Sequence, residues 1–340
     1  MNAKTHKLKP IATFHTHSWF VYAVAFSPDS KTLAAGTLED VGFSLIDTKT
    51  WKVRRILDEL DSPPDGVAFS PDSRSMIVPM GKESLLSCWD TNSGDCKWSF
   101  KPGSAAAVFS PNGRTVAATR GKELVLCDSR NGQVMHTLKG HPSRVDGAEF
   151  STDGKRIVSV AGGEVILWDA RSGAQMAVVQ RKSGDINSIS FSPSGKLLVV
   201  VGAKGLVRWY NGISGEMLSE VKAHEDTVWD AAFTPDGKRL VTADMESMRI
   251  WDAATRRELV SIPEGGPMVE VSPDGRYIAS PGPDHTIGLW RTDNGKQAAL
   301  MTKGGVGMDG CMAFSPNGLW LAATCGDEKT RVWAIKEALR

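Results

Sequence analysis

The sequence has few cysteines and no long apolar run, and each shortage excludes a class of protein. Its five cysteines are an odd number without the paired spacing of a metal site, so we expect small buried thiols that stay reduced. No apolar run approaches the ~20 residues of a membrane helix, and the first residues lack the apolar core of a signal peptide. We therefore expect a cytoplasmic protein without a membrane segment.

The sequence also has almost no net charge. Forty basic side chains stand against thirty-nine acidic ones, a formal charge of +1. This balance argues against nucleic acid as a partner, because such binding needs an excess of positive charge. The Gly-x-Ser-x-Gly, His-Glu-x-x-His, phosphate-loop and dinucleotide patterns are all absent. We predict no catalytic residue, no metal site and no cofactor.

What the sequence does contain is a repeat, first seen as Phe26-Ser27-Pro28-Asp29-Ser30. Seven further copies begin at Phe69, Phe109, Phe150, Phe191, Phe233, Val271 and Phe314. The steps between copies are 43, 40, 41, 41, 42, 38 and 43 residues. A period of about 40 residues is typical of a repeat architecture, in which each copy is one structural unit.

Each copy predicts four short strands. In the fourth copy, apolar segments at residues 145–150, 155–160, 165–169 and 176–179 are separated by short turns rich in Gly and Ser. These segments are too short for helices, and glycine supplies the positive φ that tight turns need. The unit is therefore a four-stranded antiparallel sheet.

The third predicted strand of several copies ends in Trp-Asp, and here the sequence resembles the WD40 family. The pair occurs at Trp89-Asp90, Trp168-Asp169 and Trp251-Asp252, with related forms at Trp209-Tyr210, Trp290-Arg291 and Trp333-Ala334. Two copies depart from it, with Ile46-Asp47 and Cys127-Asp128, and Gly140-His141 matches the Gly-His that opens a family repeat. The resemblance covers residues 11–334 and implies a β-propeller.

The number of strands predicts how the ring closes. Eight copies supply first, second and third strands, but only seven fourth strands follow, so the segment Ile11–Phe14 is expected to complete the last blade. We predict an all-β fold, a closed β-propeller of eight four-stranded WD40 blades. The domain is expected over residues 11–335, with a flexible tail at 1–10 and a short tail at 336–340. The alternative is a seven-bladed ring with the degenerate seventh copy outside it.

Recurring aromatic and polar residues are expected to be structural, because they follow the repeat and do not converge on one site. By the resemblance, His141 with Ser159 and Trp168 forms a hydrogen-bonded set inside one blade, and His224 with Thr242 and Trp251 forms another. Asp284 and Asp327 resemble the turn carboxylate of such a set.

The resemblance implies a scaffold that binds a peptide or protein, as a monomer, on the face formed by loops that lead into first strands and loops between second and third strands. Positions four and six residues before the recurring Phe carry contacts in the family. Aromatic, Arg and Met side chains are enriched in protein interfaces. The predicted protein-binding residues on this face are Trp19, Phe20, Tyr22, Arg120, Arg144, Lys182, Asn187, Trp229 and Met308.

Two alternatives stay open at this point. The loops of blades three to five supply a basic arc, including Arg120, Arg144 and Arg181, that suits an acidic or phosphorylated peptide. The loops of blades six to eight supply an acidic arc opposite it. The second alternative is a propeller enzyme, a hydrolase or one with metal-assisted chemistry, at the mouth of the channel.

Overall fold

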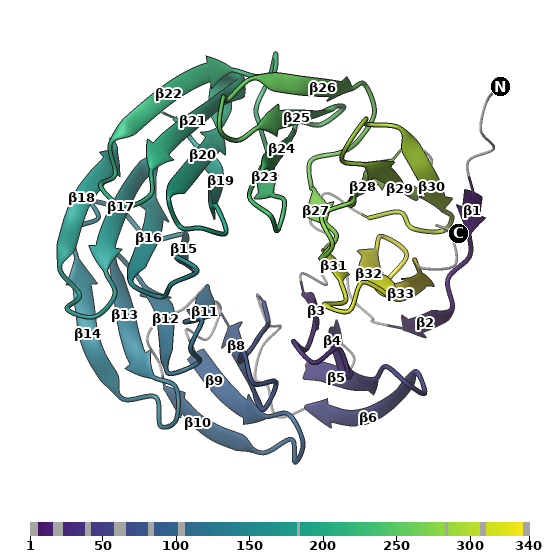
Figure 1. The fold of residues 1–340 in the computed structure, drawn as a ribbon. Coiled ribbons are helices and arrows are strands. Elements are labelled where there is room, and N and C mark those ends of the chain that lie inside the picture. Colours follow the sequence, from purple (N-terminus) through teal and green to yellow (C-terminus); the bar gives the residue numbers. More distant parts are fainter. Residues whose placement is uncertain are drawn as a thin grey trace.

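The protein is a ring of β-sheets arranged around a common axis (Figure 1). The computed structural model describes residues 6–15, 23–37, 42–57, 66–80, 85–100, 106–181, 184–282, 285–306 and 311–335. Eight sheets follow one another round the ring, which confirms the predicted count of eight blades. Among the described residues no helix is long and apolar enough to cross a membrane.

Each of the first four blades is one antiparallel sheet whose strands follow in chain order. Blade one consists of β3 (Val24–Phe26), β4 (Thr32–Thr37), β5 (Gly42–Asp47) and β6 (Lys52–Leu57). Blade two consists of β7 (Ala68–Phe69), β8 (Ser75–Met80), β9 (Leu85–Asp90) and β10 (Cys96–Phe100). Blade three consists of β11 (Ala107–Phe109), β12 (Thr115–Arg120), β13 (Glu123–Asp128) and β14 (Val134–Lys139). Blade four consists of β15 (Gly147–Phe150), β16 (Arg156–Ala161), β17 (Glu164–Asp169) and β18 (Gln175–Gln180).

The next three blades continue the pattern. Blade five consists of β19 (Ile186–Phe191), β20 (Leu197–Gly202), β21 (Leu206–Asn211) and β22 (Met217–Lys222), with the 3₁₀ turn η1 (Ala203–Gly205) between β20 and β21. Blade six consists of β23 (Asp230–Phe233), β24 (Arg239–Ala243), β25 (Met248–Asp252) and β26 (Glu258–Ile262). Blade seven consists of β27 (Glu270–Val271), β28 (Tyr277–Gly282), β29 (Thr286–Arg291) and β30 (Gln297–Met301).

Blade eight joins the two ends of the chain. It consists of β31 (Met312–Phe314), β32 (Trp320–Cys325), β33 (Lys329–Ala334) and, from the start of the chain, β2 (Ala12–His15). β2 pairs antiparallel with β33, and Figure 1 shows the two side by side at the seam. The prediction that an N-terminal strand completes the last blade is confirmed.

Part of the tail predicted for residues 1–10 forms a strand; residues 1–5 lie outside the described residues. β1 (His6–Leu8) pairs in parallel with β30, as a fifth strand at the outer edge of blade seven. The backbone N–H of Thr302 donates to the carbonyl of Leu8 at 3.1 Å. β30, the outermost strand of blade seven, has backbone N–H and C=O groups that no other strand of its blade can pair, and β1 pairs with them.

The recurring Ser-Pro-Asp has a structural cause in the turn between first and second strands. In blade one, the Ser27 hydroxyl donates to Asp29 Oδ1 at 2.6 Å and accepts the backbone N–H of Thr32 at 3.0 Å. The Asp29 carboxylate in turn accepts the N–H of Lys31 at 3.0 Å. These bonds satisfy turn N–H groups that no strand can pair, so the pattern recurs in each blade.

The two predicted hydrogen-bonded sets are present inside blades four and six. In blade six, His224 Nε2 lies 2.9 Å from Thr242 Oγ1, which also accepts the indole N–H of Trp251 at 3.0 Å. In blade four, the hydroxyl of Ser159 lies 2.6 Å from His141 Nε2 and accepts the indole N–H of Trp168 at 2.7 Å. Both imidazoles are buried.

Burial keeps both of these histidines neutral at pH 7. It lowers the pKa of His141 to about 4 and also lowers the pKa of His224. The fourth member of the set in blade six is Asp244, whose Oδ2 lies 2.9 Å from His224 Nδ1. Neutral, enclosed histidines at a repeated position hold the strands of a blade together.

Two details of the sequence alignment between copies are corrected by the structure. In blade five, Tyr210 pairs with Leu198 just as Trp168 pairs with Ile157, so Tyr210 and not Trp209 occupies the repeated Trp position. The carboxylate of Asp327 forms an ion pair with Arg331, so the prediction that it serves a histidine set is wrong. Asp284 lies outside the described residues.

Candidate functional site

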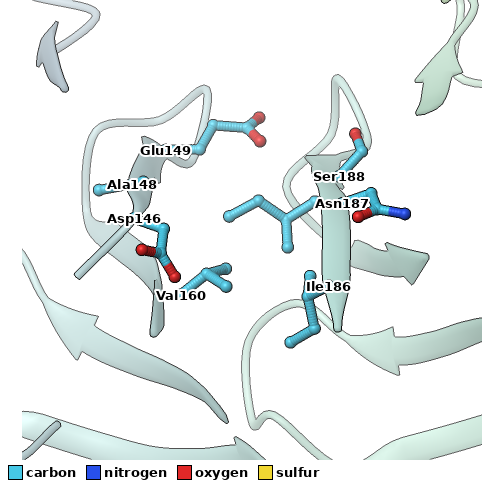
Figure 2. A pocket seen from close by; sticks show the side chains of 9 residues that line it. Asp146, Ala148, Glu149, Val160, Ile186, Asn187 and Ser188 are labelled. Atoms are coloured by element: carbon cyan, nitrogen blue, oxygen red, sulfur yellow. The ribbon is translucent and has the colours of Figure 1, made fainter. Parts of the chain in front are cut away.

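A pocket of about 390 Å³ lies between the innermost strands of blades four and five. Figure 2 shows side chains from β15 and β16 on one side and from β19 on the other. Val160 and Ile186 give it apolar walls, and Asp146 and Glu149 bring two carboxyl groups from blade four. The pocket therefore combines an apolar lining with acidic groups at a place where first strands begin.

Glu149 is the most constrained group in this pocket. Its carboxyl group extends towards blade five, where Oε1 accepts the backbone N–H of Phe191 at 3.2 Å (Figure 2). Burial raises the pKa of Glu149 to about 7, although the N–H of Phe191 favours the ionised form. Among the described residues no Lys or Arg forms an ion pair with Glu149 or with Asp146.

Asn187 connects the pocket to blade six. Its side-chain Nδ2 donates to the backbone carbonyl of Val228 at 3.0 Å. Figure 2 shows the amide group of Asn187 pointing away from blade four. Trp229 follows Val228 directly, and its side chain is 39% exposed. The structure thus brings together two of the predicted binding residues, Asn187 and Trp229, beside the pocket.

The loop that presents Trp229 is held by backbone contacts to the hairpin of blade five. The N–H groups of Ala223 and Val228 donate to the carbonyls of Gly205 and Gly202 at 2.7 and 2.9 Å. Gly205 has a φ of +70°, and a Cβ there would lie 1.9 Å from the carbonyl oxygen of His224. Only glycine allows this close approach. The bulky side chain of Trp229 is therefore exposed on a rigid support.

Trp229 is also fixed to its own blade. Its backbone N–H donates to the carbonyl of Ala243 at 2.8 Å. The next hairpin begins at Asp244 and carries Met245, whose side chain is 44% exposed. Two large apolar side chains thus occur on loops of blade six that lie at the same end of its strands. Exposed groups of this kind are not required for blade packing.

The basic arc is weaker than its sequence suggests. Arg120 Nη2 forms an ion pair with Glu123 at 2.6 Å, and Lys139 pairs with the same carboxylate at 3.4 Å. Arg120 also donates to the hydroxyl of Thr137. Arg144 is exposed at the start of blade four. The predicted binding residues Trp19, Phe20, Tyr22, Lys182 and Met308 lie outside the described residues.

The loops near Trp229 carry acidic side chains. Glu225 and Asp226 precede Trp229 in its loop, and Glu246 follows Met245 in the next hairpin; all three are exposed. Lys222 lies 3.4 Å from Glu225 and Lys204 is exposed on η1. Carboxylates therefore outnumber cations around Trp229 among the described residues.

Three carboxyl groups on innermost strands escaped the sequence analysis: Glu149, Asp230 and Glu270. Asp230 Oδ2 accepts the N–H of Val269 in blade seven at 3.1 Å, and burial raises the pKa of Asp230. Burial raises the pKa of Glu270 to about 7. The sequence did contain a sign of two of these groups. In only two copies, at Glu149 and Glu270, a carboxylate directly precedes the repeated Phe or Val. Polar groups on an apolar strand mark such positions.

A second hollow of about 960 Å³ lies between blades two and three at the opposite end of the strands, beside the Ser-Pro-Asp turns. Three of its charged lining residues, Lys97, Asp128 and Arg130, form ion pairs. Lys97 lies 2.9 Å from Asp90, and Arg130 lies 2.7 Å from Asp128. Within the described part of the chain, no group of three or more His, Cys, Asp and Glu is placed to hold a metal ion.

The fold and its repeats define an eight-bladed β-propeller. A family model described as outer membrane protein assembly factor BamB matches residues 44–299, and a model described as WD domain, G-beta repeat matches residues 8–40 and 304–334. The chain belongs to the repeat β-propellers that these two models describe, and its repeats are of the WD40 type.

The matches to curated relatives cover less than half of each relative. Autophagy-related protein 16 of Arabidopsis thaliana is 28% identical over 249 residues, covering 69% of this chain and 48% of that protein. Small ribosomal subunit protein RACK1 of Caenorhabditis elegans is 32% identical over 120 residues, covering 34% of this chain and 36% of that protein. The chain thus spans less than half the length of these relatives.

Solved structures match nearly the whole chain. The C-terminal WD40 domain of Sif2 has a TM-score of 0.81 and 17% identity, covering 98% of this chain and 99% of that one. The computationally designed protein Ika8 has a TM-score of 0.79 and 20% identity, covering 97% and 100%. At these identities the likeness shows the fold alone.

Proposed function

We propose that the protein is a non-catalytic scaffold that binds a peptide or protein on the loop face of blades four to six. The observation that carries this is Trp229, a large exposed side chain on a loop fixed to two blades. A rigid aromatic group loses little conformational entropy on binding, so it is suited to anchor a partner. WD40 proteins commonly serve as scaffolds for protein interactions, which supports the proposal.

The adjoining pocket supports the same face. It begins beside Asn187, whose side chain bonds the residue before Trp229. A partner segment that covers Trp229 would reach the pocket with its neighbouring residue. An anchor with a pocket beside it is the usual arrangement of an interface hot spot.

The two alternative functions have less support. A phosphopeptide reader would use the basic arc, in which Arg144 and Arg181 are exposed but Arg120 is engaged by Glu123. An enzyme would need an acid or base that faces a substrate together with a nucleophile or metal, and WD40 relatives are mostly non-catalytic. The partly buried carboxyl groups of Glu149, Asp230 and Glu270 accept hydrogen bonds from the backbone of the next blade. These bonds favour a structural role for all three.

We also infer that the scaffold acts in the cytoplasm. Of its cysteines, Cys88, Cys127 and Cys325 are buried, and burial raises the pKa of each thiol. Buried thiols of raised pKa are inert small hydrophobes, as a reducing compartment allows. Localisation of the tagged protein by microscopy and cell fractionation tests this.

The experiment is quantitative affinity capture from source-cell lysate with three immobilised proteins. These are the wild type, the double variant Asn187→Ala/Trp229→Ala, and the matched variant Met217→Ala, which removes an apolar side chain that is 51% exposed on the outer strand of blade five. Circular dichroism and thermal unfolding establish that all three fold. We expect a partner that binds the wild type and Met217→Ala and is lost from the double variant. Purified partner that binds all three with equal affinity would contradict the proposal.

A further inference from the structure

The pocket between blades four and five has a chemistry that selects among partners. Val160, Ile186 and Ile189 line it with apolar side chains, and Asp146 and Glu149 bring carboxyl groups. Its volume of about 390 Å³ exceeds that of one extended amino-acid side chain. A partner side chain with an apolar stem and a polar end, called the guest below, matches this lining.

The carboxyl groups lack a counter-charge. Glu149 receives one hydrogen bond, from the backbone N–H of Phe191, and Asp146 receives one from the N–H of Gly162 at 3.3 Å. Neither forms an ion pair with a basic residue in the described part of the chain. Burial of a carboxylate without a cation is costly, and for Glu149 this cost is visible as a pKa raised to about 7. A cation that entered the pocket would relieve the cost.

We propose that this pocket receives the side chain of a lysine or arginine from a partner segment bound on the loop face. The stem of the guest packs against Val160 and Ile186, and its charged end lies against the carboxylates of Glu149 and Asp146. The inference rests on the proposed protein-binding function of the same site and specifies the partner as a basic segment.

The charges on the loops of blade six favour the same partner. Glu225, Asp226 and Glu246 are exposed on the two loops that carry Trp229 and Met245, whereas Arg144 and Arg181 are exposed on the loops that lead into blades four and five. Basic residues of the partner segment that follow the inserted side chain would face the carboxylates of blade six, and such complementarity orients a partner and speeds association. An acidic segment would meet repulsion from these carboxylates.

The test uses two small probes that differ only in charge, N-acetyl-arginine methylamide and its neutral isostere N-acetyl-citrulline methylamide. Methyl resonances of Ile186 and Ile189 report on the pocket in NMR titrations of the full chain. We expect a saturable shift with the arginine probe and none at equal concentration of the citrulline probe. Glu149→Gln should weaken binding by about tenfold, because it removes a charge-assisted hydrogen bond and keeps the acceptor for Phe191 N–H.

The matched control is Glu216→Gln, an exposed carboxylate in a turn at the opposite end of the strands. It changes net charge by the same amount as Glu149→Gln and should leave the affinity for the arginine probe unchanged. Equal shifts with both probes, no saturable shift with the arginine probe, or equal weakening by both variants would overturn the inference.

The inference and the proposed function can fail separately. If a captured partner depends on Trp229 but binds Glu149→Gln as well as it binds the wild type, the scaffold stands and the basic guest is wrong. If the arginine probe binds through Glu149 while no partner depends on Trp229, the pocket stands and the scaffold proposal falls.

Discussion

The side-chain amide of Asn187 donates a hydrogen bond to the backbone carbonyl of Val228, at 3.0 Å. This bond joins the first strand of blade five to the loop that leads into blade six. It fixes the residue directly before Trp229, so the exposed indole is positioned by a neighbouring blade as well as by its own.

Asn187→Ala should therefore loosen the loop more than it destabilises the ring. We expect faster hydrogen exchange across residues 223–229 and a loss of about 1 kcal/mol in the free energy of unfolding, since one partly buried hydrogen bond is removed. Asn92→Ala, at an exposed turn of blade two, serves as the control. Exchange that is equally fast in both variants would show that the bond does not order the loop.

Trp168→Ala and Trp229→Ala should have opposite effects on folding and binding. Trp168 is 1% exposed and packs among residues of blades three and four, so its removal should cost about 3–5 kcal/mol of stability. Trp229→Ala should change stability little, because much of that side chain is exposed, and should weaken partner binding. Denaturant unfolding gives both values, and a large loss of stability in Trp229→Ala would mean that its indole is packing.

Ala323→Ser should stabilise blade eight. Among the described residues, the buried indole N–H of Trp333 has no acceptor, and Trp333 pairs with Leu321 as Trp251 pairs with Leu240. Ala323 therefore stands where Thr242 accepts the indole N–H in blade six. A serine there should add about 0.5–1.5 kcal/mol. The measurement is the midpoint of thermal or urea unfolding; a lower midpoint would mean that the hydroxyl does not fit.

Stability should fall as the pH rises through neutrality. The pKa values of Glu149 and Glu270 are raised to about 7 in the folded protein from 4.5, so between these values the folded state holds protons that the unfolded state has lost. Asp230 has a raised pKa too and adds in the same direction. The carboxylates with lowered pKa act only in the acid range. The lowered pKa values of His141 and His224 act in the opposite direction below the unfolded value of 6.5, because there the unfolded state holds protons that the folded state lacks.

The measurement is urea unfolding of the wild type and of Glu149→Gln/Glu270→Gln at about pH 5, about pH 6 and about pH 8. The stability of the wild type relative to the double variant should fall over this range, because both proteins keep the same histidines and differ only in the two carboxyl groups. A difference that stays constant or rises from about pH 5 to about pH 8 would contradict the assigned cause.

The ring was predictable because repetition makes each signal recur. The Ser-Pro-Asp turn and its variants satisfy the same local need in every blade, and a buried Trp recurs at one position in five of them, so the copies confirm one another. The missing fourth strand was predictable by the same logic, and β2 fills it. β1 was not predictable, because it is only three residues long and Leu8 is its one apolar residue, which packs against the core of blades seven and eight.

The candidate site was less predictable, since repeat phase locates positions and not contacts. Asn187 and Trp229 were predicted from their position four residues before the repeated Phe. The ion pair of Arg120 with Glu123 depends on how one hairpin folds, and the carboxyl group of Glu149 depends on the neighbouring blade. In blade five the sequence pattern assigned the repeated Trp position to Trp209, because Trp209 is itself a Trp. The strand pairing shows that the next residue, Tyr210, occupies that position.

The seam also sets the order in which the molecule can be completed. β1 and β2 are the first strands to be synthesised. β2 pairs with β33, at the far end of the chain, and β1 pairs with β30, which is also synthesised late. During synthesis the earliest segment stays without its partners until nearly all other blades exist. Blades one to six can form from neighbouring strands in the meantime, so ring closure is the late, long-range step that slows folding. It is also where the ring should first open.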